Sequence, residues 1–74
     1  MRKQIIQVIE LEIGDRYEYI EAGGINQKPT AVEVGDIAAK DKFEHTLIYI
    51  EDSKTKRVHQ HFSTAYVVLT SHSE

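Results

Sequence analysis

The chain contains no cysteine and no tryptophan among its 74 residues, and it has a single proline. Without cysteine it cannot form a disulfide, a zinc–thiolate centre or a thiol nucleophile. Small secreted domains commonly depend on disulfides, because a short chain buries too little apolar surface to be stable by its core alone. The absence of such cross-links therefore favours a cytoplasmic protein.

Long apolar segments are also missing. The basic start of the chain, residues 1–3, is followed by an apolar segment at residues 5–9. Glu10 and Glu12 interrupt this segment long before a signal-peptide core or a membrane span is complete. We therefore expect no targeting segment and no membrane association.

Neither sign of charge is in large excess. Nine Lys and Arg residues oppose twelve Asp and Glu residues, which gives a formal net charge of −3. A domain that neutralises many phosphates needs a basic surface, so this balance argues against nucleic-acid binding. Lys54, Lys56 and Arg57 do cluster, but Glu51 and Asp52 lie beside them, which favours an ordinary mixed-charge surface.

The chain has no catalytic signature. It lacks Gly-x-Ser-x-Gly, a phosphate-binding glycine loop and His-Glu-x-x-His. Gly23 and Gly24 form a double glycine, but no Lys-Ser pair or predicted helix follows it, so we interpret it as a flexible turn. We therefore expect no enzymatic activity and no cofactor.

Alternation of apolar and polar residues predicts short strands along the whole chain. The expected strands are residues 4–13, 16–21, 30–34, 46–51, 57–62 and 65–70. We expect one all-β domain over residues 1–70, with a small five- to six-stranded antiparallel sheet curled into an SH3-like or OB-like barrel. Residues 71–74 are expected to form a flexible C-terminal tail.

The connections predict how these strands pair. A turn at residues 14–15 predicts a hairpin between the first two strands, with Tyr17 and Tyr19 on one face. Residues 22–29 carry the double glycine and the proline, and they predict a long loop. Residues 37–43 fit two alternatives, a continuation of strand 30–34 or a single helical turn capped by Asp36.

The loop around residues 52–56 sets the register of a second hairpin. An odd loop of three or five residues pairs Ile50 with Val58 and places His59 opposite Tyr49. An even loop would oppose Tyr49 to Val58 and pair Ile50 with a charged residue, which is a poorer match. We therefore favour the odd register.

Two unbroken apolar runs occupy residues 47–50 and 66–69. Successive side chains of a strand point to opposite faces, so such runs require cover on both faces, and 74 residues are too few to supply it. The predicted function is a non-catalytic protein-binding module of the inhibitor or adaptor type, as found among bacterial, phage and mobile-element accessory proteins. We expect a homo-oligomer that acts through an apolar sheet face or edge. The expected partner-binding residues are Ile48, Ile50, Tyr66, Val67 and Leu69.

His59 and His61 are two residues apart on a predicted strand, so they share a face and could present two imidazoles to one metal ion. A zinc site needs a further protein ligand, for which His45 or a carboxylate such as that of Glu44 is a candidate. We favour the simpler interpretation, in which both histidines lie on the outer face beside Tyr49 and Leu47 and bind no metal. A pH-sensitive interface is a further alternative.

The alternative function is binding of single-stranded nucleic acid by an OB-like or SH3-like surface. Tyr17 and Tyr19 would stack on bases, with Arg16 and Lys28 near the phosphates. Glu18 lies in the same segment and would repel phosphate. We therefore favour a protein interface or the core as the place of these tyrosines.

Overall fold

The structure is a computed structural model that describes residues 3–21, 28–42 and 45–72. In these ranges the chain forms strands joined by turns, with one turn of 3-10 helix. The elements are β1 (Gln4–Gln7), η1 (Val8–Glu10), β2 (Arg16–Tyr19), β3 (Thr30–Lys42), β4 (His45–Asp52), β5 (Val58–Phe62) and β6 (Tyr66–Ser71).

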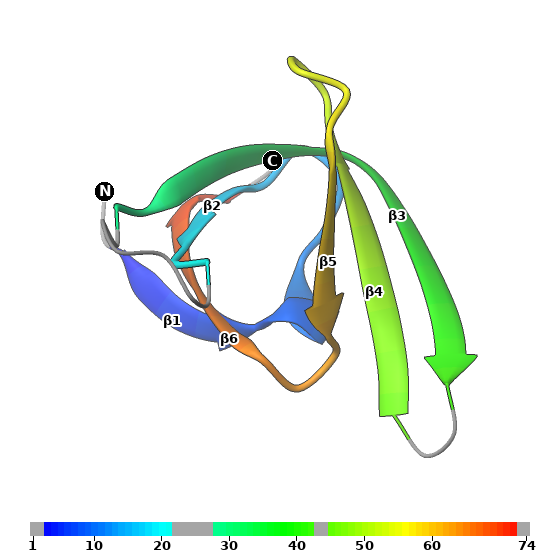
Figure 1. Cartoon of the computed structure of the whole chain (residues 1–74). Helices are drawn as coiled ribbons and strands as arrows, with labels where there is room; N and C mark the ends of the chain where they lie inside the picture. The colour runs from blue at the N-terminus through cyan, green and yellow to red at the C-terminus, as the bar shows by residue number, and fades with distance from the viewer. Residues whose placement is uncertain (1–2, 22–27, 43–44, 73–74) are drawn as a thin grey trace.

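The six strands form one antiparallel sheet in the order β1-β6-β2-β3-β4-β5. Figure 1 shows this sheet curling around a central space, with β2 and β5 on different sides of it. β1 and β5 are the edge strands of the described sheet, and they do not pair with each other. The expected all-β class and antiparallel sheet are confirmed, whereas a closed SH3-like or OB-like barrel is not.

β3 is the strand that bends the sheet. Residues 30–33 pair with β2, and from Val34 onward the strand pairs with β4. The register shifts between Val34 and Asp36, so Gly35 occupies a bulge. A Cβ atom on Gly35 would lie 2.9 Å from Cα of Ser53, closer than real Cβ contacts come. Glycine at this position therefore lets the turn after β4 pack against the bend.

Beyond the bend, β3 and β4 continue as a long antiparallel pair, here termed the arm, whose far end projects from the rest of the sheet (Figure 1). Residues 37–42 continue the strand, so the alternative of a helical turn is wrong for them. Residue 43 lies outside the described ranges. β5 pairs with β4 only as far as Leu47, so the end of the arm consists of two strands.

The predicted first hairpin is wrong. β1 pairs with β6, and the chain leaves the sheet at Val8 to form η1 instead of continuing as a strand to residue 13. The cause is local: the Gln7 N–H donates to the Glu10 carboxylate, and the Val8 side chain is buried in the core. Gly14 then adopts a φ of 96°, which favours glycine, in the turn that leads into β2.

β4 and β5 form the predicted second hairpin, but in a different register. Ile50 pairs with His59 and Ile48 pairs with His61, so the favoured odd register is wrong. Directly paired residues of an antiparallel sheet share a face. Both histidines therefore point to the inner face of the sheet, and the prediction that they lie on the outer face is also wrong.

A four-residue turn at residues 53–56 produces this register. The carboxylate of Asp52 accepts hydrogen bonds from the N–H groups of Lys54 and Thr55, at 2.7 and 3.1 Å. Lys56 then adopts a φ of 63°, and the chain reverses into β5. A capping aspartate, rather than the matching of apolar residues across the strands, thus decides the loop length.

The core lies on the inner face of the curled sheet. Four of the residues predicted to bind a partner belong to it, since Ile48, Ile50, Val67 and Leu69 are each at most 8% exposed. Their assignment to an exposed surface is therefore wrong, because the curl of the sheet lets one chain cover its own inner face. The buried core residues are Val8, Leu11, Tyr17, Val32, Val34, Ile48, Ile50, Val67 and Leu69.

The end of the chain returns to the start of β2. Ser71 is the last residue of β6, and Nδ1 of His72 lies 3.0 Å from Oδ1 of the buried Asp15. These two residues of the expected flexible tail thus have defined positions, and residues 73 and 74 lie outside the described ranges.

Candidate functional site

β2 carries two tyrosines on one face of the sheet. Tyr17 and Tyr19 are two residues apart, and their stacked rings have centroids 6.0 Å from each other. Tyr17 pairs with Val32 of β3 on one side and with Leu69 of β6 on the other. The Tyr17 side chain is completely buried, and Tyr19 packs against the core. Both rings therefore point into the interior of the curled sheet.

β5 brings two histidines into the same interior. Oη of Tyr17 lies 2.9 Å from Nε2 of His61, and Oη of Tyr19 lies 2.7 Å from Nδ1 of His59. The Tyr19 ring also meets both imidazoles edge to face, with centroid distances of 5.6 Å and 4.5 Å. β3 and β4 separate β2 from β5 in the sheet order. These four side chains, here termed the Tyr–His cluster, thus connect two strands across the interior.

The hydrogen bonds define the proton positions in one half of the Tyr–His cluster. Oη of Tyr19 donates to Oε1 of Glu21 at 3.2 Å. A phenol has one proton and a carboxylate only accepts, so His59 donates its Nδ1–H to the Tyr19 oxygen. His59 thus donates to Tyr19, and Tyr19 donates to the Glu21 carboxylate.

Burial determines the protonation of Tyr17 and His61, the other two residues of the Tyr–His cluster. It raises the pKa of Tyr17 well above the ordinary value, and the neighbouring Tyr19 and the negative charge of Asp52 raise it further. Burial also lowers the pKa of His61, and positive charge on His59 adds to this effect. Tyr17 and His61 are therefore both neutral near pH 7. This neutral pair is a hydrogen-bonded link between β2 and β5.

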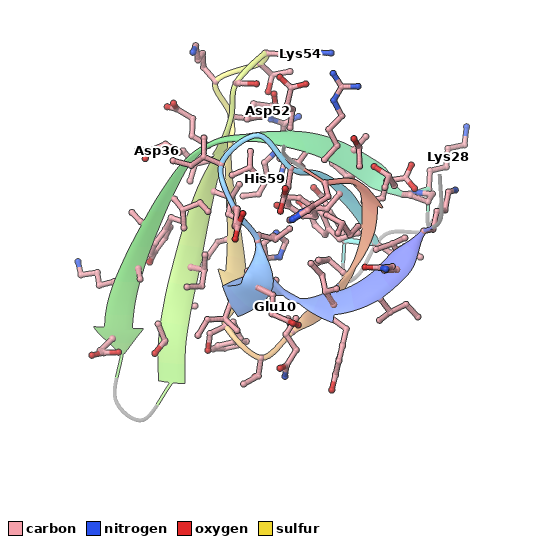
Figure 2. The ribbon with its side chains drawn as sticks, turned by 180° about the vertical axis from the view of Figure 1, so that it is seen from behind. Glu10, Lys28, Asp36, Asp52, Lys54 and His59 are labelled. Atoms are coloured by element: carbon pink, nitrogen blue, oxygen red, sulfur yellow. The ribbon has the colours of Figure 1, made fainter. Side chains whose placement is uncertain are left out.

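Asp52 lies beside the Tyr–His cluster at the turn end of β5, and Figure 2 shows it between His59 and Lys54. Burial alone would raise its pKa. Hydrogen bonds from the backbone N–H groups of Lys54, Thr55 and Glu33, together with positive charge on His59, bring the pKa of Asp52 below its ordinary value. The cluster therefore has a fixed negative charge next to His59.

Among the described side chains, no group of three or more His, Asp or Glu residues is placed to hold a metal ion, either around the two histidines or elsewhere. His59 and His61 are instead hydrogen-bonded to tyrosines. The side chains of the two candidate third ligands, His45 and Glu44, lie outside the described part of the chain.

The residues predicted to bind nucleic acid do not form one surface. Tyr17 is buried, so it cannot stack on a base, and Tyr19 faces the interior. Nε of Arg16 donates to Oε2 of Glu33 at 2.9 Å, so this cation is already paired. Lys28 is exposed near the beginning of β3 (Figure 2). The predicted base-stacking surface is therefore wrong.

Tyr66 is the residue of the predicted partner surface that is exposed, at 70% of its area. On the outer side of the sheet it lines a groove of about 390 Å³ together with Ile5, Ile20 and Val68. Ile5 and Val68 are directly paired between β1 and β6. This groove is the part of the apolar run 66–69 that the chain leaves uncovered.

A second feature, which the sequence pattern did not reveal, is the side of β5 that faces away from β4. Asp52 N–H donates to the carbonyl of Arg57 just before β5, and Ser63 N–H donates to β4 just after it. In an antiparallel pair, every second residue of a strand directs its N–H and C=O groups to the neighbouring strand. Because Arg57 and Ser63 both bond to β4, the odd-numbered residues of β5 direct their backbone groups to β4. The backbone groups of Val58 and Gln60 then point away from β4. They have no hydrogen-bond partner within the described ranges.

The side chains along this β5 edge are apolar and exposed. Val58 is 60% exposed and Phe62 is 54% exposed, and both lie on the outer face with Gln60 between them. An open groove of about 460 Å³ lies beside the edge, lined among others by Ile20, Gln60 and His61. In the sequence, Val58 and Phe62 alternate with the two histidines of β5. This alternation identifies Val58 and Phe62 as exposed only when the histidines are known to face the interior.

No helix in the described ranges is long and apolar enough to cross a membrane. Comparisons with protein-family models, with curated proteins and with solved structures find no significant match to this chain.

Proposed function

We propose that this protein is a non-catalytic protein-binding module that takes up an extended segment of its partner as an additional strand beside β5. The observation that supports this proposal is the outward-directed backbone of Val58 and Gln60, which lacks hydrogen-bond partners within the described ranges. An extended peptide can pair with such an edge through main-chain hydrogen bonds. The module then acts as an inhibitor or adaptor, by occupying a segment of its partner.

The inner face of β5 supports this role because it is held in place. His59 and His61 direct their side chains to tyrosines of β2, while their backbone groups pair with β4. A strand that is already fixed loses little conformational entropy when a peptide adds to it. In this proposal the peptide extends the curled sheet as it would extend a half-open barrel of the SH3-like type.

The outer face of β5 offers selectivity. Alternate side chains of an added strand would lie beside Val58 and Phe62, which are both apolar and more than half exposed. A partner segment with apolar residues at alternate positions fits this edge best. The groove of about 460 Å³ beside Gln60 gives the added strand space next to the end of β2.

The test compares Gln60→Pro with Gln60→Ala. Proline removes the N–H that points away from β4 and leaves the bonds between β4 and β5 intact, whereas alanine retains the N–H. The probe is a displayed library of random linear peptides, selected on the wild-type protein. We expect the selected peptides to bind wild type and Gln60→Ala alike, and to bind Gln60→Pro about tenfold more weakly or worse.

Circular dichroism and thermal unfolding establish that both variants remain folded. Peptides that bind the folded Gln60→Pro variant as tightly as wild type would use another surface and would refute strand addition at β5. When the protein used in the selection is monomeric, a library that yields no binding peptide would refute strand addition as well.

A further inference from the structure

We propose that the extended segment bound at the β5 edge is β5 of a second copy of this chain, so that the protein forms a two-fold symmetric dimer centred on Gln60. This inference rests on the proposed function, because it uses the same edge, and it names the partner. Three observations support it: the residue pattern of β5 is complementary to itself, the exposed charges at the two ends of β5 differ in sign, and the outward N–H of Gln7 on the β1 edge is already bonded.

The residue pattern of β5 is complementary to itself. When two copies pair in antiparallel fashion about Gln60, Val58 of one copy lies opposite Phe62 of the other, and this happens twice by symmetry. Each of these residues is on the outer face and exposed, so the two contacts bury apolar surface that one chain leaves in water. The pairing also brings together the residues whose backbone groups point away from β4.

The exposed charged side chains at the two ends of β5 are of opposite sign, because Glu51 and Asp52 at the turn end are partly or fully buried. Lys56 and Arg57 lie at the turn that precedes the strand, and both are exposed. At the other end, Ile9 N–H donates to the carbonyl of Ser63 at 3.1 Å, which places the exposed Glu10 beside the residues that follow β5. Figure 2 shows Glu10 and the turn residue Lys54 at opposite ends of this part of the molecule.

Antiparallel pairing exploits this polarity. It puts the basic turn of each copy next to the acidic end of the other, so opposite charges meet at both ends of the interface. A parallel arrangement would place like charges together. We therefore expect the dimer to dissociate more readily as salt concentration rises.

The other edge of the sheet is less suited to pairing. Val8 N–H donates to the carbonyl of Ala65, so the alternate residues of β1 direct their backbone groups outward. Among these, the Gln7 N–H already donates to Oε2 of Glu10 at 2.9 Å. A head-to-tail chain that pairs β5 with β1 would have to break this bond. A closed two-fold contact between β5 strands does not.

The first measurement is the absolute mass in solution, by size-exclusion chromatography with light scattering over a range of concentrations. We expect wild type and Gln60→Ala to reach twice the mass of one chain. In Gln60→Pro the symmetric pairing loses one hydrogen bond from each copy, so the dissociation constant should rise about 30-fold.

Cysteine cross-linking then tests the register, since the chain has no cysteine of its own. Two copies of Gln60→Cys would have Cα atoms about 5.5 Å apart, within the range of a disulfide, and should cross-link on mild oxidation. Val58→Cys is the matched control, because its two copies would lie about 14 Å apart and should not cross-link.

The outcomes separate this inference from the proposed function. A wild-type monomer at all concentrations overturns the dimer, while peptide selection at the β5 edge still tests strand addition independently. A dimer that Gln60→Pro does not weaken, an assembly larger than a dimer, or equal cross-linking of the two cysteine variants also overturns the proposed two-fold pairing.

Discussion

Oη of Tyr17 lies 2.9 Å from Nε2 of His61, although β2 and β5 are not neighbours in the sheet. A parallel link joins Tyr19 to His59 at 2.7 Å. Two hydrogen bonds between side chains therefore span the interior of a sheet whose edge strands do not pair with each other. The Tyr–His cluster holds β5 in place while the outer edge of β5 stays accessible.

The cluster predicts a pH dependence of stability. The folded pKa of His61 is lowered from 6.5, chiefly by burial, so the unfolded chain takes up a proton at a higher pH than the folded chain does. The free energy of unfolding is therefore fully retained above the unfolded pKa, and it decreases as pH falls from about 7 through 6.5 towards the folded pKa. Urea unfolding at a series of pH values measures this slope.

His61→Gln is the matched variant for this prediction, because an amide can donate a hydrogen bond to Tyr17 or accept one from it but does not titrate. The slope between about pH 7 and pH 5 should be smaller in the variant than in wild type. Equal slopes would show that His61 is not the responsible group. The lowered pKa values of Asp52 and Glu33 act separately, because their contribution is lost only as pH falls below the ordinary carboxyl range.

The turn at residues 53–56 should depend on the Asp52 side chain. Asp52→Ala removes an acceptor that holds the N–H groups of Lys54 and Thr55, so we expect a loss of about 2 kcal/mol in the free energy of unfolding. Asp52→Asn retains an acceptor oxygen and should lose less. Chemical denaturation of both variants measures the difference, and an equal loss would assign the effect to the charge of Asp52 rather than to its hydrogen bonds.

The bend in β3 should not tolerate a side chain. Gly35→Ala places a methyl group 2.9 Å from Cα and Cβ of Ser53, so the turn after β4 must move. We expect a loss of about 2 kcal/mol in the free energy of unfolding, in the range found for overpacking. Adding Ser53→Gly removes only one of the two close contacts and should restore part of this loss. Unchanged thermal stability of Gly35→Ala would contradict the close approach.

The same substitution at two neighbouring residues of β6 should change stability by very different amounts. Val67 is 3% exposed and Tyr66 is 70% exposed. Val67→Asp buries an unpaired carboxylate and should cost about 3 kcal/mol or more, enough to unfold a domain of this size. Tyr66→Asp should change stability by less than about 1 kcal/mol. Comparable thermal unfolding of the two variants would contradict the inward orientation of Val67.

The places of the strands were largely predictable from the sequence, because alternation and turn residues act over a few neighbours. Residues 4–7, 16–19, 30–34, 46–51, 58–62 and 66–70 are strands both in the prediction and in the structure. The shared face of Tyr17 and Tyr19 also follows from alternation alone. Local pattern, however, left open which strand each of these would join.

The faces of β4 and β5 were not predictable in the same way. The parity of one loop decides whether His59 faces the core or the solvent, and a cap by Asp52 determines that parity. The apolar run at residues 47–50 predicted that a second molecule covers one face of this strand. In the structure Ile48 and Ile50 are covered by β2 and β6 of the same chain, which the curl of the sheet brings over them.

Composition and local alternation suffice to identify this protein from its sequence as an all-β domain without cysteine chemistry. Three features appear only in the folded sheet: β1 joins β6, β3 bends at Gly35, and tyrosines of β2 contact histidines of β5 across the interior. These features depend on contacts between residues distant in the chain. Their free energy comes from burial and hydrogen bonding in the folded sheet, which no short window of sequence contains.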